Sequence, residues 1–100
     1  MNTSMQEVLD IDRIIHEPAR LAILAILWAV ESADFLYLLN ATDLTRGNLS
    51  SHLNKLDEVG YVSIKKTFVG KIPRTVCSMT ESGRTAFEAY RSKMRDFFGE

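Results

Sequence analysis

The chain has 100 residues, of which 46% are hydrophobic and 25% are charged, enough apolar content for one compact domain with a modest core. Its longest apolar stretch, Leu21 to Val30, spans ten residues and is too short to cross a bilayer, and the first twelve residues lack the pattern of a signal peptide. The single cysteine, Cys77, excludes an intramolecular disulfide, which agrees with a reducing compartment. Together these features predict one cytoplasmic domain over residues 1–100 without a membrane partner.

The net charge of −1 argues at first against a polyanionic partner, but the charges are distributed unevenly. Between Thr45 and Thr75 there are six Lys and Arg residues and only two acidic ones, a local balance of +4 that leaves −5 for the rest of the chain. A basic segment in acidic surroundings is typical of a protein that presents one face to nucleic acid.

Three apolar patterns precede this basic segment. Apolar residues between Val8 and Ile15 have helical spacing and predict a short lead-in to the domain over residues 1–12. Pro18 suits the first turn of a longer helix that continues through the apolar stretch. A second short helix is predicted over residues 35–41, followed by a tight turn at residues 42–44.

A third helix is predicted over residues 46–59, with Thr45 as its N-cap and Gly60 as the residue that ends it. Its apolar residues form one stripe, made of Leu49, Leu53, Leu56 and Val59. Small and polar residues fall on the opposite side, namely Gly47, Ser51, Asn54 and Glu58. The helix is therefore expected to bury one side and to leave a flat polar side free.

Alternating residues over 61–67 and 74–80 predict a β-hairpin, with a basic turn over residues 68–73. Pro73 cannot donate a hydrogen bond to a sheet, so we expect it at the start of an edge strand. Thr80 then caps a last helix that runs to about Phe98.

The order helix, helix, turn, helix, hairpin, helix resembles a winged helix-turn-helix domain. Three stretches strengthen the resemblance: "HEPARLAIL" is similar to the opening of bacterial and archaeal winged-helix repressors, "LSSHLNKLDEVGYV" to their recognition helix, and "MTESGR" to the start of their closing helix. We place the chain near the MarR and ArsR groups, closest to the short MarR-like forms. The resemblance implies an α+β, mainly α fold with a two-stranded wing and a long C-terminal helix, in a homodimeric regulator that binds specific double-stranded DNA.

In such proteins the recognition helix enters the major groove and the wing contacts the backbone or a minor groove. Arg74 is the best candidate for the minor groove, whereas His52 lies nearer the apolar stripe and is expected to make a local contact. The predicted DNA-binding residues are Thr45, Arg46, Gly47, Asn48, Ser50, Ser51, Asn54 and Lys55 on the helix, and Lys65, Lys66, Lys71 and Arg74 on the wing.

Apolar residues near the end of the last helix suggest a dimer interface, because the core should be complete before them. The predicted interface consists of Tyr90, Met94, Phe97 and Phe98, completed by Leu9, Ile11 and Ile14. Two-fold symmetry would place two recognition helices about 34 Å apart on a palindromic operator.

No pattern indicates catalysis, a cofactor, a metal site or an effector, since the chain has two histidines and one cysteine and lacks a Gly-rich phosphate loop. Cys77 is expected to be a packed side chain and not a redox switch. The main alternative is a winged-helix module that binds protein in place of DNA, because a fold does not decide function. RNA binding ranks third, because no aromatic platform for base stacking is evident.

Overall fold

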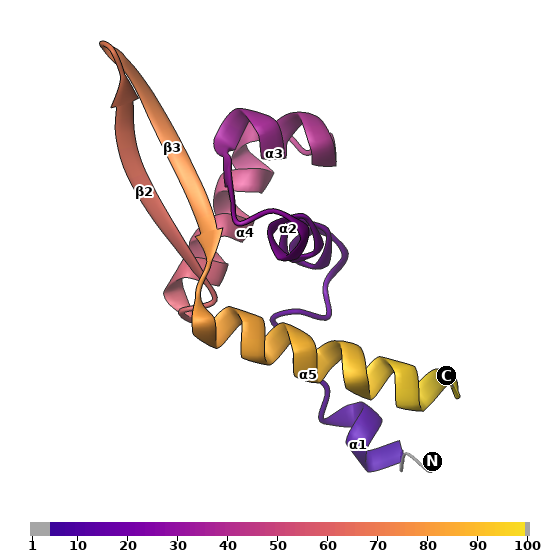
Figure 1. Ribbon diagram of the computed structural model, residues 1–100. Helices are drawn as coiled ribbons and strands as arrows, with labels where there is room; N and C mark the ends of the chain where they lie inside the picture. Colours follow the sequence, from indigo (N-terminus) through magenta and orange to yellow (C-terminus); the bar gives the residue numbers. More distant parts are fainter. Residues whose placement is uncertain (1–4, 100) are drawn as a thin grey trace.

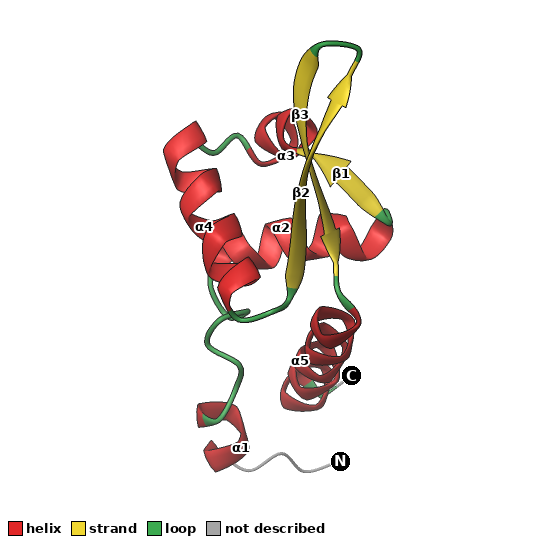
Figure 2. Cartoon of the chain, turned by 90° about the vertical axis from the view of Figure 1, so that its left-hand side faces the viewer, coloured by secondary structure: helices red, strands yellow, loops and turns green. Residues whose placement is uncertain are grey.

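The computed structural model, which describes residues 5–99, has a mainly helical α+β fold in which helices pack on one side of a small antiparallel sheet (Figure 1). A long hairpin extends from one end of the molecule, and the C-terminal helix, seen nearly end-on, lies toward the other end (Figure 2). The elements are α1 (Met5–Leu9), α2 (Pro18–Ala29), β1 (Ser32–Asp34), α3 (Phe35–Thr42), α4 (Arg46–Glu58), β2 (Val62–Val69), β3 (Ile72–Met79) and α5 (Glu81–Phe98). This order confirms the predicted winged helix-turn-helix.

Apart from the lead-in, the predicted helix starts are confirmed, and the predicted capping side chains mark those of α4 and α5. The hydroxyl of Thr45 accepts a hydrogen bond from the backbone N–H of Asn48 at the start of α4, and that of Thr80 accepts one from Gly83 at the start of α5. Pro18 occupies the first turn of α2, where its missing N–H costs nothing. Gly60, at φ +85°, takes the left-handed conformation that turns the chain from α4 into the hairpin.

The lead-in differs from its prediction, and its residues 1–4 lie outside the described part of the chain. The helix covers Met5–Leu9 and not Val8 to Ile15. The carboxylate of Asp12 accepts hydrogen bonds from the backbone N–H groups of Ile14 and Ile15, at 2.9 and 3.2 Å. This local side-chain bonding replaces the helical pattern and turns the chain toward α2.

The sheet contains one strand that we did not predict. The short strand β1 pairs with β3, so the strand order is β1-β3-β2 and β3 is central. The prediction that Pro73 lies in an edge strand is therefore wrong. However, β1 pairs only with Val76 to Ser78, so at Pro73 the side of β3 that faces away from β2 has no paired strand and proline is tolerated there. The strands also extend further than expected, leaving Gly70 and Lys71 as a two-residue turn.

One apolar core joins the helices to the sheet. Its buried members are Ile15, Ile23, Leu24, Leu27, Ala33, Leu38, Leu49, Leu53, Leu56, Val62, Cys77, Met79, Phe87 and Tyr90. The three leucines of the α4 stripe are at most 2% exposed, whereas Val59, assigned to the same stripe, is 37% exposed because α4 ends at Glu58. The core fixes α4 against α2 and the base of the hairpin, so the outward side of α4 has a defined orientation.

Candidate nucleic-acid interface

The outward side of α4 is open to solvent along its whole length. Every residue predicted to contact DNA from this helix and its cap is exposed, namely Thr45, Arg46, Gly47, Asn48, Ser50, Ser51, Asn54 and Lys55. A Cβ atom added at Gly47 would meet no atom within 4 Å. Gly47 is therefore not required by packing within the chain, and its lack of a side chain leaves the backbone accessible to a ligand.

The wing, residues 62–79 of β2 and β3 with their turn, carries the second group of predicted residues. Lys65, Lys66, Lys71 and Arg74 are all exposed. A hollow between α4 and the wing is lined by Ser50 and Asn54 from the helix and by Lys66 and Thr75 from the hairpin. The fold thus brings polar groups of α4 and a wing cation to the same surface.

Arg74 is tied to β1 by an ion pair. Its Nε donates to Oδ2 of Asp34 at 3.2 Å, while Oδ1 of the same carboxylate accepts from the backbone N–H of Tyr37 and caps α3. Asp34 therefore has two partners, Arg74 and the N–H of Tyr37. Arg74 must release Asp34 before it can bind a ligand. Sequence reasoning missed this contact because β1 was not predicted.

Two other cations of this surface have weak partners. The guanidinium of Arg46 lies 6.0 Å from the centre of the Phe35 ring. Lys55 Nζ lies 3.7 Å from Oε1 of Glu58, and both side chains are largely exposed. Such solvent-exposed pairs contribute little free energy, so both cations are available to a polyanion.

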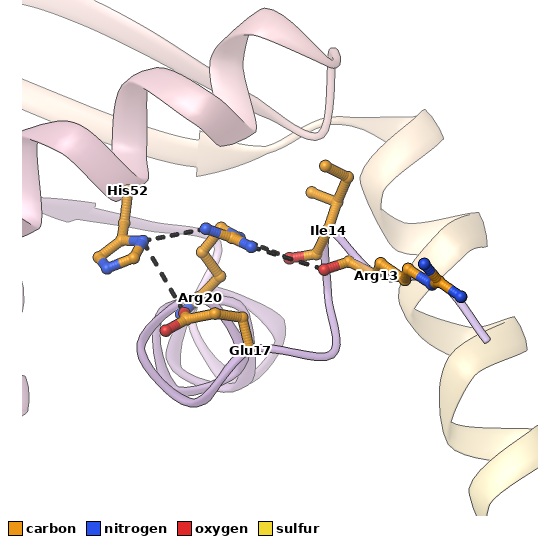
Figure 3. Close-up of polar contacts among 5 residues, drawn as sticks. All are labelled: Arg13, Ile14, Glu17, Arg20 and His52. Carbon is orange, nitrogen blue, oxygen red and sulfur yellow. Dashed lines mark hydrogen bonds and ion pairs between the residues drawn. The ribbon is translucent and has the colours of Figure 1, made fainter. Parts of the chain in front are cut away.

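A polar cluster behind α4 connects this helix to α2 and to the lead-in (Figure 3). The Nε of Arg20 donates to the carbonyl of Ile14 at 2.6 Å, and Nη1 of Arg20 lies 3.2 Å from Nδ1 of His52. Because a guanidinium only donates, Nδ1 of His52 is the acceptor in this hydrogen bond. The prediction that His52 makes a local contact is confirmed.

Arg20 is a residue that the sequence analysis did not select. It is the lone charged residue in α2, and a charge in an otherwise apolar helix was the signal that could have found it. The carboxylate of Glu17 lies 3.8 Å from Nδ1 of His52, a contact that becomes an ion pair only when the imidazole is protonated. The Oε1 atom of Glu17 also caps α2, because it accepts a hydrogen bond from the backbone N–H of Arg20 at 2.8 Å.

Comparison with known proteins decides the family. The family model of the winged helix DNA-binding domain matches residues 19–98, from the second residue of α2 to the end of α5. The chain belongs to this family. The predicted resemblance to small winged-helix transcriptional regulators is thereby confirmed.

Relatives of this winged-helix protein span most of its length. An uncharacterised protein of Methanocaldococcus jannaschii is 40% identical over 78 residues, covering 78% of this chain and 85% of the relative. The structure of a transcriptional regulator homologue from Pyrococcus horikoshii OT3 superposes with a TM-score of 0.89 at 31% identity, over 95% of this chain and 96% of the other. A putative MarR-family regulator from Enterococcus faecalis V583 shares the fold, with a TM-score of 0.74 at 22% identity over 92% and 84% of the two chains.

The predicted dimer residues of the winged-helix protein divide into three groups by burial. Tyr90 is only 7% exposed, because it packs against Phe87 and its hydroxyl lies 2.9 Å from Nδ1 of His16. The expectation that a partner chain covers Tyr90 is therefore wrong, since the chain's own residues do so. Ile11, Ile14 and Met94 are partly buried against the core, whereas Leu9, Phe97 and Phe98 are 67%, 40% and 65% exposed.

Cys77 lies at the centre of the sheet of the winged-helix protein and is fully buried. Burial, together with the charge of Asp34, raises the pKa of its thiol to about 11. A thiol that stays protonated near neutral pH is a poor nucleophile, which agrees with the prediction of a packed side chain. Among residues 5–99, no three potential ligands group to hold a metal ion, and none of the helices is long and apolar enough to cross a membrane.

Proposed function

We propose that this winged-helix protein is a homodimeric transcriptional regulator that binds a palindromic double-stranded operator, with α4 in the major groove and the wing on the backbone and minor groove. The observation that carries the proposal is the shared hollow in which Ser50 and Asn54 of α4 face Lys66 of the wing. A DNA duplex bound at this hollow would contact hydrogen-bonding side chains and a cation at once, which suits a ligand that presents both base edges and phosphates.

The side chains of α4 fit the chemistry of base edges. An Asn amide both donates and accepts, so Asn54 can pair with the N6 and N7 atoms of adenine in the major groove. Gly47 permits close approach of the backbone, while Asn48 and Ser51 offer further donors and acceptors. Thr45 and Arg46, at the helix N-terminus, suit a phosphate, because the free N–H groups of the first turn favour an anion.

The wing cations would add contacts to phosphates. Lys65, Lys66 and Lys71 have no ion-pair partner among the described residues, so they can engage the backbone without breaking an internal contact. Arg74 would exchange Asp34 for a narrow minor groove, where negative potential is concentrated.

A homodimer through α5 and α1 is supported by the exposed apolar residues at the far end of the molecule from the wing. In Figure 1, α5 continues past the body and α1 lies beside it. Phe97 and Phe98 pack edge to face with ring centres 5.1 Å apart and are 40% and 65% exposed. A second copy would cover them, with the exposed Leu9 at the margin.

The test of DNA binding is selection of genomic fragments by the purified protein, followed by titration of the preferred duplex at several salt concentrations. We expect log K to fall with log salt by about 0.9 for each phosphate neutralised. Absence of duplex binding, or a flat salt dependence, would favour the protein-interaction module.

The dimer has a separate test. Phe97→Ser combined with Phe98→Ser should convert a sedimenting dimer into monomers, without affecting the core. A matched control is Leu36→Ser, which changes a residue that is 55% exposed on α3 and should leave the dimer intact. A dimer that survives the double substitution would refute the interface.

A further inference from the structure

The tip of the wing is apolar on both of its faces. The two residue pairs next to the Gly70–Lys71 turn are Phe68 with Pro73 and Val69 with Ile72. Phe68, Val69 and Ile72 are 67%, 57% and 70% exposed. The four residues together are called the apolar tip below.

A polar and cationic band lies directly beneath the apolar tip. The next two pairs along the hairpin are Thr67 with Arg74 and Lys66 with Thr75. Lys71, in the turn, adds a cation above the tip. The wing therefore alternates cation, apolar surface and cation along its length.

The apolar tip is not part of the core. The third strand, β1, pairs with β3 only as far as Val76, so the outer hairpin is a two-stranded ribbon. Both views show this ribbon reaching beyond the helices (Figures 1 and 2). Isolated exposed apolar residues are common on proteins, but four clustered at a free strand end are an aggregation hazard unless a ligand covers them.

The positive charge of the neighbouring residues favours a polyanion as that ligand, in agreement with the DNA of the proposed function. Lys66 belongs both to the band beneath the tip and to the hollow shared with α4, so the apolar tip continues the proposed DNA surface. Strands of a ribbon lie about 4.8 Å apart before side chains are added, and a minor groove is about 6 Å wide. The groove therefore admits side chains of the tip but not the whole ribbon.

We infer that the apolar tip is a wedge that enters the minor groove beside the operator half-site and packs Phe68, Val69 and Ile72 against sugars and base edges, while Arg74 lies in the same groove and Lys66 holds a flanking phosphate. Apolar wedges inserted from the minor groove partly unstack base steps and bend the duplex. The N2 amino group of guanine projects into this groove, so the wedge favours flanks that lack it. The inference rests on the proposed function and adds a second, apolar means of recognition.

The test compares wild type with a triple variant, Phe68→Thr, Val69→Thr and Ile72→Thr, on the selected genomic duplex. Threonine keeps the strand preference and all the cations, and the three residues lie outside the core, so the melting temperature should not change. We expect about tenfold or greater loss of affinity from the lost apolar burial and an unchanged salt slope. The matched control, Lys66→Ala, should instead lower the salt slope by about 1.

A second measurement locates the tip in the groove. Replacing guanine by inosine in the flanks removes the N2 amino group and leaves the major groove unaltered. Wild type should bind the inosine duplex more tightly and bend it more, measured by energy transfer between end labels. The triple variant, which keeps Arg74, should gain less affinity from inosine and should show no added bend. Wild type that binds DNA while the triple variant matches it in affinity and bending overturns the wedge alone; wild type that binds no duplex overturns the proposed function as well.

Discussion

Arg20 of α2 and His52 of α4 are joined by a hydrogen bond of 3.2 Å, and the same guanidinium holds the carbonyl of Ile14. The contact connects the back of α4 to the chain segment that follows α1. Because the side chain of His52 is only 23% exposed, the bond lies in a partly dry environment where a lost partner is costly.

Arg20→Ala should therefore destabilise the protein by about 1–3 kcal/mol, since it leaves the Ile14 carbonyl and the His52 imidazole without their donor. In a double-mutant cycle with His52→Ala, measured by urea unfolding, the two effects should be coupled by about 0.5 kcal/mol or more. Strict additivity would show that the bond contributes nothing to stability.

Asn54→Ala should change which base pairs are tolerated in the operator. Asn54 is exposed on the outward side of α4, and removing a bidentate base contact costs about 1–3 kcal/mol at one position only. Binding to a set of single-base operator variants measures this effect. An affinity loss of equal size on every duplex would assign Asn54 to the backbone.

Asp34→Asn should strengthen DNA binding by releasing Arg74. Asparagine is as good an N-cap as aspartate, so α3 should remain stable while the ion pair of 3.2 Å is lost. We expect a salt slope steeper by up to about 1, because one further cation meets the duplex and releases a counterion. If Arg74→Ala removes this gain in the double variant, Arg74 is its source; unchanged binding by Asp34→Asn would exclude Arg74 from the interface.

The hydroxyl of Tyr61 should stabilise the fold up to high pH. It donates to Oδ2 of Asp12 at 2.6 Å, and this hydrogen bond, with desolvation and the carboxylate charge, raises the pKa of Tyr61 from 10.0 to about 12. Since the folded state holds the proton more tightly, the contribution is complete below pH 10 and is lost as pH rises through 12. Urea unfolding should show Tyr61→Phe to be less stable than wild type at pH 8, by about 1 kcal/mol, with the difference vanishing toward pH 12. A constant difference over this range would contradict the assignment.

Cys77 should react with thiol reagents only when the sheet opens. Its side chain is fully buried and the pKa of its thiol is raised to about 11, so both access and thiolate formation oppose attack. Modification of the native protein should be slower than that of the urea-unfolded chain by about a thousandfold or more. Rapid labelling of the folded protein would reopen the possibility of a redox role.

Much of the fold could be predicted because local signals agreed with one another. Thr45 and Thr80 cap their helices, and the stripe of Leu49, Leu53 and Leu56 is buried. The lead-in was predicted wrongly because the carboxylate of Asp12 bonds to its own backbone, which apolar spacing does not reveal.

Contacts between distant segments were beyond the sequence pattern. The strand β1 has three residues, too few for a period to be recognised, and its pairing places Asp34 beside Arg74. Tyr90 seemed to lie beyond the core because its partner His16 is 74 residues away. The extent of the exposed apolar tip was also not predicted, since alternation along a strand indicates two faces but not how far the ribbon extends past the body.

Because β1 ends at the pair formed by Asp34 and Val76, the length of the wing beyond this pair can change without affecting the three-stranded part of the sheet. Two extra residues in each hairpin strand would extend it by about 7 Å while each existing side chain kept its face. A single extra residue per strand would exchange the faces. Insertion of two residues into each strand, in evolution or by design, would thus change the distance between the half-site and the flanking DNA that the wing contacts. The core would not need to be repacked.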